Sequence, residues 1–308
     1  MMIFFRKALS YIIRHFLTFL PEKPYLKLLY FVEVGAVLNL EDPKTFTEKI
    51  QWLKVHAFKE EYTKLVDKLA VKDYVAKIIG QEYIIPTLGV WDNVNDIDWD
   101  SLPQQFVLKT THGGGSCGVV VCKNKSTFDI EAAKSKLQKS MRTSACRSYR
   151  EHPYDAVPRK ILAEKYIAPR IVEGQEITDL PDYKFFCFNG EPQYCQVIRD
   201  RNSKETIDFY DMDWIHQEFV GLVGLNPNVK NGANPVDKPA SLEQMKEICR
   251  KLAVGIPFVR VDLYVTGEKH FFGELTFYPA GGFGRFTPDE WNLRLGELIN
   301  INNESIWR

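Results

Sequence analysis

A glycine-rich loop between two short hydrophobic runs constrains this chain more than any other feature. Residues 106–109 and 119–122 have the β-branched and aromatic content of strands, and four glycines occur among the nine residues 110–118. Glycine lets backbone N–H groups approach an anion without obstruction by a Cβ atom. The pattern therefore predicts an antiparallel hairpin whose loop binds phosphate, with Lys109 at its entrance. A plain flexible turn is the alternative.

Two common phosphate loops are excluded. A Walker A loop ends in Gly-Lys-Ser/Thr and continues into a helix, and the dinucleotide-binding fingerprint also opens a helix, whereas a strand follows here. Two reactive side chains lie within the loop. His112 either contacts phosphate or orders the loop, and Cys117 has no neighbouring histidine directly beside it in the sequence, so we expect it to be inert.

A second feature is a pair of carboxylates on the last two predicted strands, 259–265 and 269–277. Side chains alternate along a strand, so Asp262 shares a face with Arg260. A three-residue connection at 267–269 places Asp262 directly opposite Glu274. Opposed carboxylates destabilise a sheet unless a cation neutralises them, and oxygen ligands favour magnesium bound with nucleotide phosphates. The alternative is that Arg260 pairs with one carboxylate while the other faces water.

A third feature is a hairpin with two cations. Asn189-Gly190 is a strong two-residue turn signal between the strand-like runs 183–188 and 193–199. Such a turn pairs Lys184 with Cys195 and places Lys184 on the same face as Arg199. Two cations on one face need a counter-charge, and a polyphosphate would supply it. The alternative partners are Asp182 and Asp200.

The composition limits the possible binding partners and the cellular compartment of the protein. The chain of 308 residues has 40 Lys+Arg and 40 Asp+Glu, so no global basic field attracts nucleic acid. The six cysteines show no C-x-x-C spacing, and the six histidines include no H-x-x-x-H or H-E-x-x-H pair. This pattern favours a reduced, cytoplasmic protein without a dedicated zinc site.

The first 20 residues are apolar and aromatic, but Arg6, Lys7 and Arg14 interrupt them. That pattern disfavours both a membrane span and a cleaved signal peptide. On a helix these cations gather toward one side, and the remainder is occupied largely by Phe4, Phe5, Ile12, Phe16 and Phe19. We expect the helix to dock on its own protein. Peripheral contact of residues 1–20 with the inner face of a membrane is the alternative.

Strands and helices are mixed irregularly, which predicts an α+β fold. Helical periodicity dominates the first 80 residues, where Thr45 and Glu48 have capping-box spacing. We expect a helical N-terminal region at 1–80, a lid subdomain with the glycine-rich loop at 81–165, and a larger subdomain with the magnesium site at 166–308.

The order of these motifs resembles the ATP-grasp superfamily, and specifically its TupA-like branch from bacterial surface-polysaccharide gene clusters. The resemblance covers about Asp42 to Leu298. It is carried by short motifs at 42–52, 66–68, 74–75, 85–91, 106–118, 163–167, 182–190, 260–262 and 272–282. It implies an ATP-grasp fold, in which two α+β subdomains clamp a nucleotide, with ATP and Mg²⁺ as cofactors.

The resemblance also implies roles for individual residues. Lys109 and Lys184 would contact nucleotide phosphates, and Arg199 or Arg260 would contact the transferred phosphate. Magnesium would be held by Asp262 and Glu274, with Thr276 at the position where the superfamily commonly has Asn. The loop residues closing over the phosphates would be His112, Gly113, Gly114, Gly115, Ser116 and Gly118. The adenine edge and the ribose would contact Glu164, Lys165, Tyr166 and Ile167.

The implied activity is that of an ATP-dependent carboxylate–amine ligase. ATP phosphorylates a carboxylate, and an amine displaces phosphate from the acylphosphate to form an amide. The acceptor would be a small molecule or a polysaccharide precursor. Two alternatives remain: a nucleotide-sugar glycosyltransferase, for which Asp211-Met212-Asp213 supplies a D-x-D motif, and a catalytically silent nucleotide-binding scaffold, for which Thr276 is the only hint.

Overall fold

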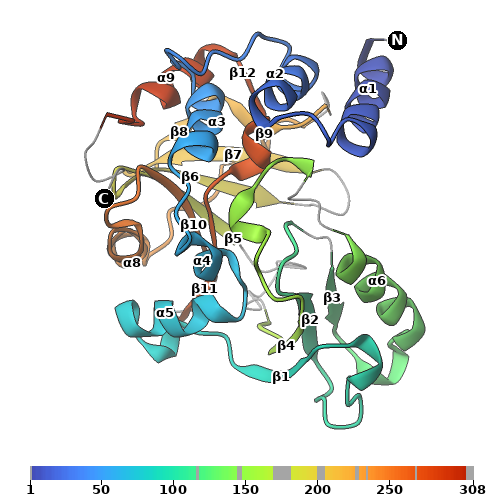
Figure 1. Cartoon of the computed structure of the whole chain (residues 1–308). Coiled ribbons are helices and arrows are strands. Elements are labelled where there is room, and N and C mark those ends of the chain that lie inside the picture. The colour runs from blue at the N-terminus through green and yellow to red at the C-terminus, as the bar shows by residue number, and fades with distance from the viewer. Residues whose placement is uncertain are drawn as a thin grey trace. The chain divides into compact units, whose positions relative to one another are not determined.

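The computed structural model describes residues 2–115, 118–143, 148–168, 182–199, 205–225, 229–233, 235–267 and 269–302. The chain forms two compact units, whose elements are labelled in Figure 1. Unit 1 contains residues 1–58, 148–150 and 181–308, and unit 2 contains residues 59–147 and 151–180. The helical region expected at 1–80 is thus divided between the two units.

Unit 2 is built on a four-stranded antiparallel sheet in the order β1-β4-β2-β3. Phe106, Leu108 and Ala163 from this sheet form a core with Leu137 of the amphipathic helix α6. As predicted, β2 and β3 form a hairpin around the glycine-rich loop. The elements are α4 (Tyr62–Val66), α5 (Ala70–Ile79), β1 (Thr87–Trp91), β2 (Phe106–Thr110), β3 (Val119–Cys122), α6 (Ile130–Arg142) and β4 (Ile161–Lys165), with short 3-10 helices η1 (Gln81–Tyr83), η2 (Val94–Asp96), η3 (Lys125–Thr127) and η4 (His152–Tyr154).

Unit 1 is built on a six-stranded antiparallel sheet in the order β11-β10-β5-β6-β7-β8. A separate pair, β12 and β9, forms a small second sheet. The strands are β5 (Asp182–Phe188), β6 (Glu191–Arg199), β7 (Thr206–Asp211), β8 (His216–Gln217), β9 (Val220–Val223), β10 (Phe258–Thr266), β11 (Lys269–Thr276) and β12 (Arg285–Thr287).

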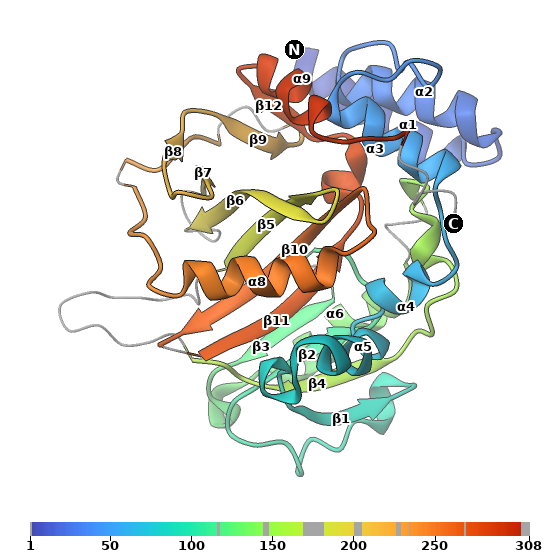
Figure 2. The ribbon, with the colours of Figure 1, turned by 90° about the vertical axis from the view of Figure 1, so that its left-hand side faces the viewer.

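The two faces of the six-stranded sheet have different environments. Helix α8 (Leu242–Ala253) packs across β5, β6 and β10 on one face (Figure 2) and buries Cys249 against Cys187. On the other face the Phe46 ring contacts Phe186 and Phe258, with centroid separations of 6.4 and 5.0 Å. We call this side the Phe46 face. Because side chains alternate along each strand, Lys184, Arg260 and Asp262 also point to the Phe46 face.

The remaining elements of unit 1 are helical. Helix α3 (Phe46–His56) begins at Thr45, and the predicted capping box between Thr45 and Glu48 is confirmed. In that box the Thr45 side chain accepts from the Glu48 N–H, and the Glu48 side chain accepts from the Thr45 N–H at 3.0 Å. The others are α1 (Met2–Phe16), α2 (Glu22–Glu33), η5 (Pro279–Gly282) and α9 (Glu290–Glu297).

Helix α1 docks on its own unit, as expected, through the completely buried Ile13 and through polar residues on the same side. Arg6 donates to the carbonyl oxygen of Val32 at 2.8 Å, whereas Phe4 and Phe5 are exposed. Within the described residues, no helix is both long enough and apolar enough to cross a bilayer.

Candidate functional site

Asp262 and Glu274 lie opposite each other on β10 and β11, as the sequence predicts. The route to this pairing differs from the expected one. The pair nearest the turn is Thr266 and Lys269, so the β11 residues near the turn pair one position earlier than a three-residue connection predicts. Gly273 is an extra residue in β11 and forms a bulge, which brings Asp262 opposite Glu274 again. A Cβ atom on Gly273 would lie 3.0 Å from the carbonyl oxygen of Asp262, so this bulge position favours glycine.

Arg260 bridges the two carboxylates. Its Nε and Nη2 atoms donate to Oδ1 and Oδ2 of Asp262, each at 2.7 Å. The same Nη2 atom donates to Oε1 of Glu274 and to Oγ1 of Thr276, each at 3.1 Å. The alternative in which Arg260 serves only one carboxylate is therefore wrong.

Lys184 adds a second cation to this cluster. Its ammonium group donates to Asp262 and forms an ion pair with Asp182 at 2.7 Å. Burial raises the pKa of Asp262, and Arg260 and Lys184 oppose that shift. Burial also acts to lower the pKa of Arg260, but the charge and hydrogen bonds of Asp262, together with the charges of Glu274 and Asp182, outweigh burial and raise it. Asp262 is thus held inside the cluster, whereas the Glu274 side chain keeps 30% of its surface exposed.

The oxygen atoms of this hairpin fit magnesium. Asp262, Glu274 and Thr276 offer two carboxylates and a hydroxyl, and all three contact the same Arg260 nitrogen. Protein sites for magnesium commonly use one or two carboxylates and complete the coordination with substrate phosphates. Among the described residues, no group of three or more His, Cys, Asp and Glu side chains could hold a metal alone. Nucleotide phosphates would therefore have to complete this site.

Unit 2 brings Lys109 and Glu164 together and adds a third residue, Lys72. The two ammonium groups lie 2.6 and 2.5 Å from the Glu164 carboxylate, which is 5% exposed. Burial acts to raise the pKa of Glu164, but Lys109 and Lys72 lower it overall. Sequence reasoning missed Lys72. The available signal was a lysine on the apolar side of α5, next to the buried Val71 and Val75.

The glycine-rich loop has a tight end and an open end. Gly118 has φ +76°, and a Cβ atom there would lie 2.2 Å from the Ser140 hydroxyl of α6 and 2.4 Å from the Thr110 hydroxyl. Gly115 also has positive φ, but its added Cβ would meet no atom within 4 Å. Only glycine fits at Gly118, and the backbone at Gly115 is accessible. Ser116 and Cys117 lie outside the described residues.

His112 orders the loop. Its Nε2 atom lies 3.2 Å from the carbonyl oxygens of both Ser140 and Thr143 at the end of α6, and burial lowers the pKa of the ring. Gly113 is held at the loop entrance, because Lys68 donates to its carbonyl oxygen. Lys165, Tyr166 and Ile167 follow Glu164 at the end of β4, and the Lys165 N–H donates to the carbonyl oxygen of Pro86 at 3.0 Å.

Arg199 does not share a face with Lys184, so that prediction is wrong. The turn at Asn189-Gly190 forms as expected, but an extra residue at Gln193 shifts the register, and Lys184 pairs with Gln196 instead of Cys195. Arg199 therefore points to the α8 side of the sheet, where it pairs with Asp208 at 2.9 Å. Asp200 lies outside the described residues.

The D-x-D motif is part of a turn. The Asp211 carboxylate accepts from the N–H groups of Asp213 and Ile215 at 3.0 and 2.8 Å and from the Gln217 side chain at 3.2 Å. These bonds give Asp211 a structural role, and they do not favour the glycosyltransferase alternative.

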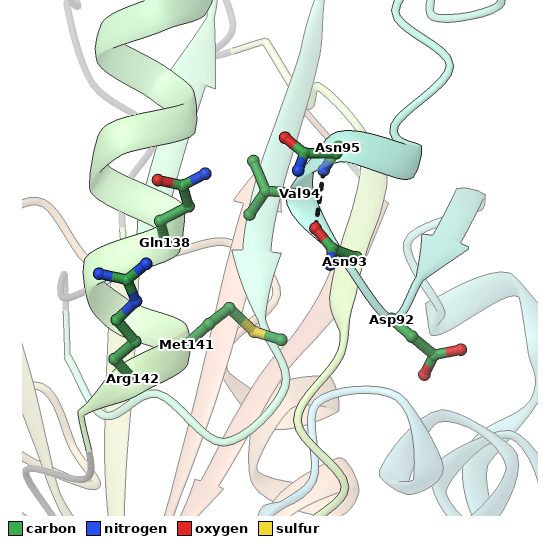
Figure 3. A pocket seen from close by; sticks show the side chains of 7 residues that line it. All are labelled: Asp92, Asn93, Val94, Asn95, Gln138, Met141 and Arg142. Carbon is green, nitrogen blue, oxygen red and sulfur yellow. Dashed lines mark hydrogen bonds between the residues drawn. The ribbon is translucent and has the colours of Figure 1, made fainter.

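Two pockets lie within single units. In unit 2 a pocket of about 240 Å³ lies between the segment Asp92–Asn95 and the Gln138, Met141 and Arg142 side chains of α6, and it contains no predicted site residue (Figure 3). In unit 1 a pocket of about 230 Å³ is lined by Arg260 together with Gln196, Glu205 and Ala280. The second pocket therefore adjoins the carboxylate hairpin.

A glycine-rich hairpin in one α+β unit and a carboxylate hairpin in the other define the class of ATP-grasp proteins. The chain belongs to the TupA-like ATPgrasp family, which matches residues 48–300. The match spans both units and includes every residue of the two clusters described above.

Solved structures with a similar fold include D-alanine–D-alanine ligases and a RimK domain protein. The ligase from Bacillus anthracis has 15% identity and TM-score 0.39, with 74% of this chain and 60% of that chain covered. The ligase from Coxiella burnetii has 11% identity and TM-score 0.42, with 82% and 59% covered. The RimK domain ATP-grasp protein from Sphaerobacter thermophilus has 12% identity and TM-score 0.40, with 77% and 69% covered.

This chain spans 60% and 55% of the length of the two Bacillus anthracis ligase structures that it matches. A search of curated proteins finds no match. The TM-scores are low, so the family assignment rests on the sequence match.

Proposed function

We propose that this protein is an ATP-dependent ligase that joins a carboxylate to an amine through an acylphosphate. The observation that carries the proposal is the cluster of Asp262, Glu274 and Arg260 on adjacent strands of a member of the ATP-grasp family. Two carboxylates and a buried guanidinium on one strand pair suit the binding of magnesium and the transfer of a phosphoryl group.

Each residue of the carboxylate hairpin has a role in this proposal. Asp262, Glu274 and Thr276 would hold magnesium, which when bound neutralises charge on the transferred phosphoryl group. Arg260 donates to Asp262 through both Nε and Nη2, so its guanidinium is held on the strand pair, where it would contact the transferred phosphate. Lys184 would balance the remaining charge of the polyphosphate.

The cluster in unit 2 would also bind nucleotide phosphates. Lys109 would contact the α- and β-phosphates, and the open backbone at Gly115 would donate to them. Glu164 holds Lys109 and Lys72 in place through two ion pairs. The backbone from Lys165 to Ile167 would contact the adenine and the ribose, as the resemblance implies.

The pocket beside Arg260 supports a small acceptor. Its volume of about 230 Å³ suits a single sugar acid or amino acid, and Gln196, Glu205 and Arg260 place polar groups of both charges along its wall. We propose a sugar acid or an amino acid of a surface polysaccharide, or of its precursor, as one substrate. The polysaccharide is what the resemblance of the sequence to the TupA-like branch implies.

The proposal is tested by Glu274→Gln, which removes one carboxylate from a partly exposed position. We expect the affinity for Mg-ATP, measured by thermal shift and by titration calorimetry, to fall at least about 100-fold. Glu243→Gln on the exposed side of α8 is the matched control and should leave the affinity unchanged. If the wild-type protein shows neither protection by Mg-ATP nor acceptor-dependent release of ADP, the ligase proposal fails.

A further inference from the structure

Helix α1 exposes its apolar side. Five large apolar or aromatic side chains point away from unit 1 along the helix, and a sixth follows it. They are Phe4, Phe5, Tyr11, Ile12, Phe16 and Phe19, with exposed fractions of 80, 68, 53, 46, 65 and 77%. We call these six residues the aromatic surface. Figure 1 shows α1 at the outer edge of unit 1, with α2 beside it.

The orientation of α1 is fixed by the residues of its other side, where Ile13 is completely buried in the core and polar residues form hydrogen bonds. Arg6 donates to the carbonyl oxygen of Val32, Ser10 donates to the Glu33 carboxylate, and Arg14 donates to the Tyr149 hydroxyl at 3.1 Å. Ser10 and Glu33 are both buried, with 1 and 8% exposure. Rotating the helix to hide its aromatic rings would expose Ile13 and break these bonds. Outward exposure of the rings is therefore built into the fold.

The charge of the helix indicates what covers the aromatic surface. Residues 1–21 contain Arg6, Lys7, Arg14 and His15 and no Asp or Glu. Lys7 and His15 are exposed beside the rings. A helix with an aromatic side and flanking cations suits the boundary between the headgroups and acyl chains of an anionic bilayer. The helix has 15 residues, and none of the described helices qualifies as a membrane span, so it would lie in the plane of the interface.

We propose that the aromatic surface docks the protein on an anionic membrane. A second copy of the chain is a poorer occupant, because a symmetric contact would bring the cations of two such helices together with no carboxylate on either. Anionic headgroups supply the missing negative charge, and the acyl chains accept the rings.

The test uses the full-length protein and sedimentation with large vesicles of phosphatidylcholine containing about 30 mol% phosphatidylglycerol. We expect the wild-type protein to bind these vesicles and to bind pure phosphatidylcholine vesicles much more weakly. Phe5→Gln/Phe16→Gln should reduce partitioning about 100-fold, since each buried ring contributes about tenfold. Added salt should also weaken binding.

A matched control is Ile215→Gln/Val254→Gln, which removes two apolar side chains that are 61 and 74% exposed on other elements. This variant should bind as the wild-type protein does. Unchanged circular dichroism of both variants shows that the fold is intact. Failure of the wild-type protein to bind the anionic vesicles overturns the proposal. So does equal binding to both kinds of vesicle, or a dimer that Phe5→Gln/Phe16→Gln dissociates without any vesicle binding.

Discussion

At the scale of single residues, Glu164 forms ion pairs with both Lys72 and Lys109 in unit 2. Glu164→Gln would leave the two lysine ammonium groups close together in a largely buried position. We expect the free energy of unfolding to fall by about 3–5 kcal/mol, because removing one member of a buried ion pair leaves charge uncompensated. Urea unfolding measures this loss.

A variant of Lys72, the ion-pair partner, provides the control for Glu164→Gln. Lys72→Met removes one of the two cations, so Glu164→Gln should cost less when it is added to Lys72→Met than when it is made alone. Equal costs in both backgrounds would show that the ion pair does not act as a unit.

The same carboxylate predicts a pH dependence. Lys109 and Lys72 hold the pKa of Glu164 below its ordinary value. Glu164 therefore stabilises the protein above its unfolded pKa of about 4.3, and that stability is lost as the pH falls through the lower folded value. The acid side of the stability profile should be flatter in Glu164→Gln than in the wild-type protein.

The residues of the two clusters could be predicted from the sequence better than the residues with which they pair. Strand alternation and the resemblance singled out Lys109, Glu164 and Lys184. Lys72 was missed, because its partner Glu164 lies 92 positions later and no local pattern announces a long-range ion pair. The side of α1 that docks could not be predicted either, since the bonds of Arg6 and Ser10 go to the C-terminal end of α2.

At the scale of elements, turns were predictable and bulges were not. Asn189-Gly190 marks its turn through two residues that accept positive φ, and both have it. The extra residues Gln193 and Gly273, which form the bulges, have no comparable sequence signal. Each bulge moves every strand residue beyond it to the opposite face of the sheet. The bulge at Gln193 moved Arg199 to the other face. The bulge at Gly273 offset an error in the assumed connection and kept Asp262 opposite Glu274.

The bulge at Gly273 predicts the effect of Gly273→Ala. The new Cβ would press on the carbonyl oxygen of Asp262 and on the Tyr264 ring, at 3.0 and 3.1 Å. We expect about 1–3 kcal/mol of lost stability from overpacking. Because the strain falls on Asp262 itself, the affinity for Mg-ATP should fall as well.

Gly224→Ala is the control for that experiment, since a Cβ atom there meets no atom within 4 Å. It should change neither stability nor nucleotide affinity. Gly273→Ala with wild-type affinity for Mg-ATP would show that the bulge does not position the carboxylates.

At the scale of the whole molecule, unit 1 is assembled from three segments of the chain, and they meet at one buried side chain. Lys54 belongs to the first segment and is 1% exposed. Its ammonium group donates to the carbonyl oxygen of Tyr149 at 2.9 Å and to that of Gly281 at 2.7 Å. These carbonyls belong to the second and third segments, so a single cation joins all three.

This junction predicts the effect of Lys54→Met, which keeps the apolar stem and removes the charge. The carbonyl groups of Tyr149 and Gly281 would each lose a charged donor, with Gln51 still donating to Gly281, and we expect the free energy of unfolding to fall by about 3 kcal/mol. Lys49→Met on the same helix is the control, because Lys49 donates to the Ile299 carbonyl oxygen and is half-buried; it should cost about 1 kcal/mol. Hydrogen exchange at residues 279–284 should accelerate in Lys54→Met alone. Equal losses of unfolding free energy in the two variants would mean that Lys54 contributes no more than an ordinary surface lysine. The three segments would then be held together by other contacts, such as those of the Phe46 ring.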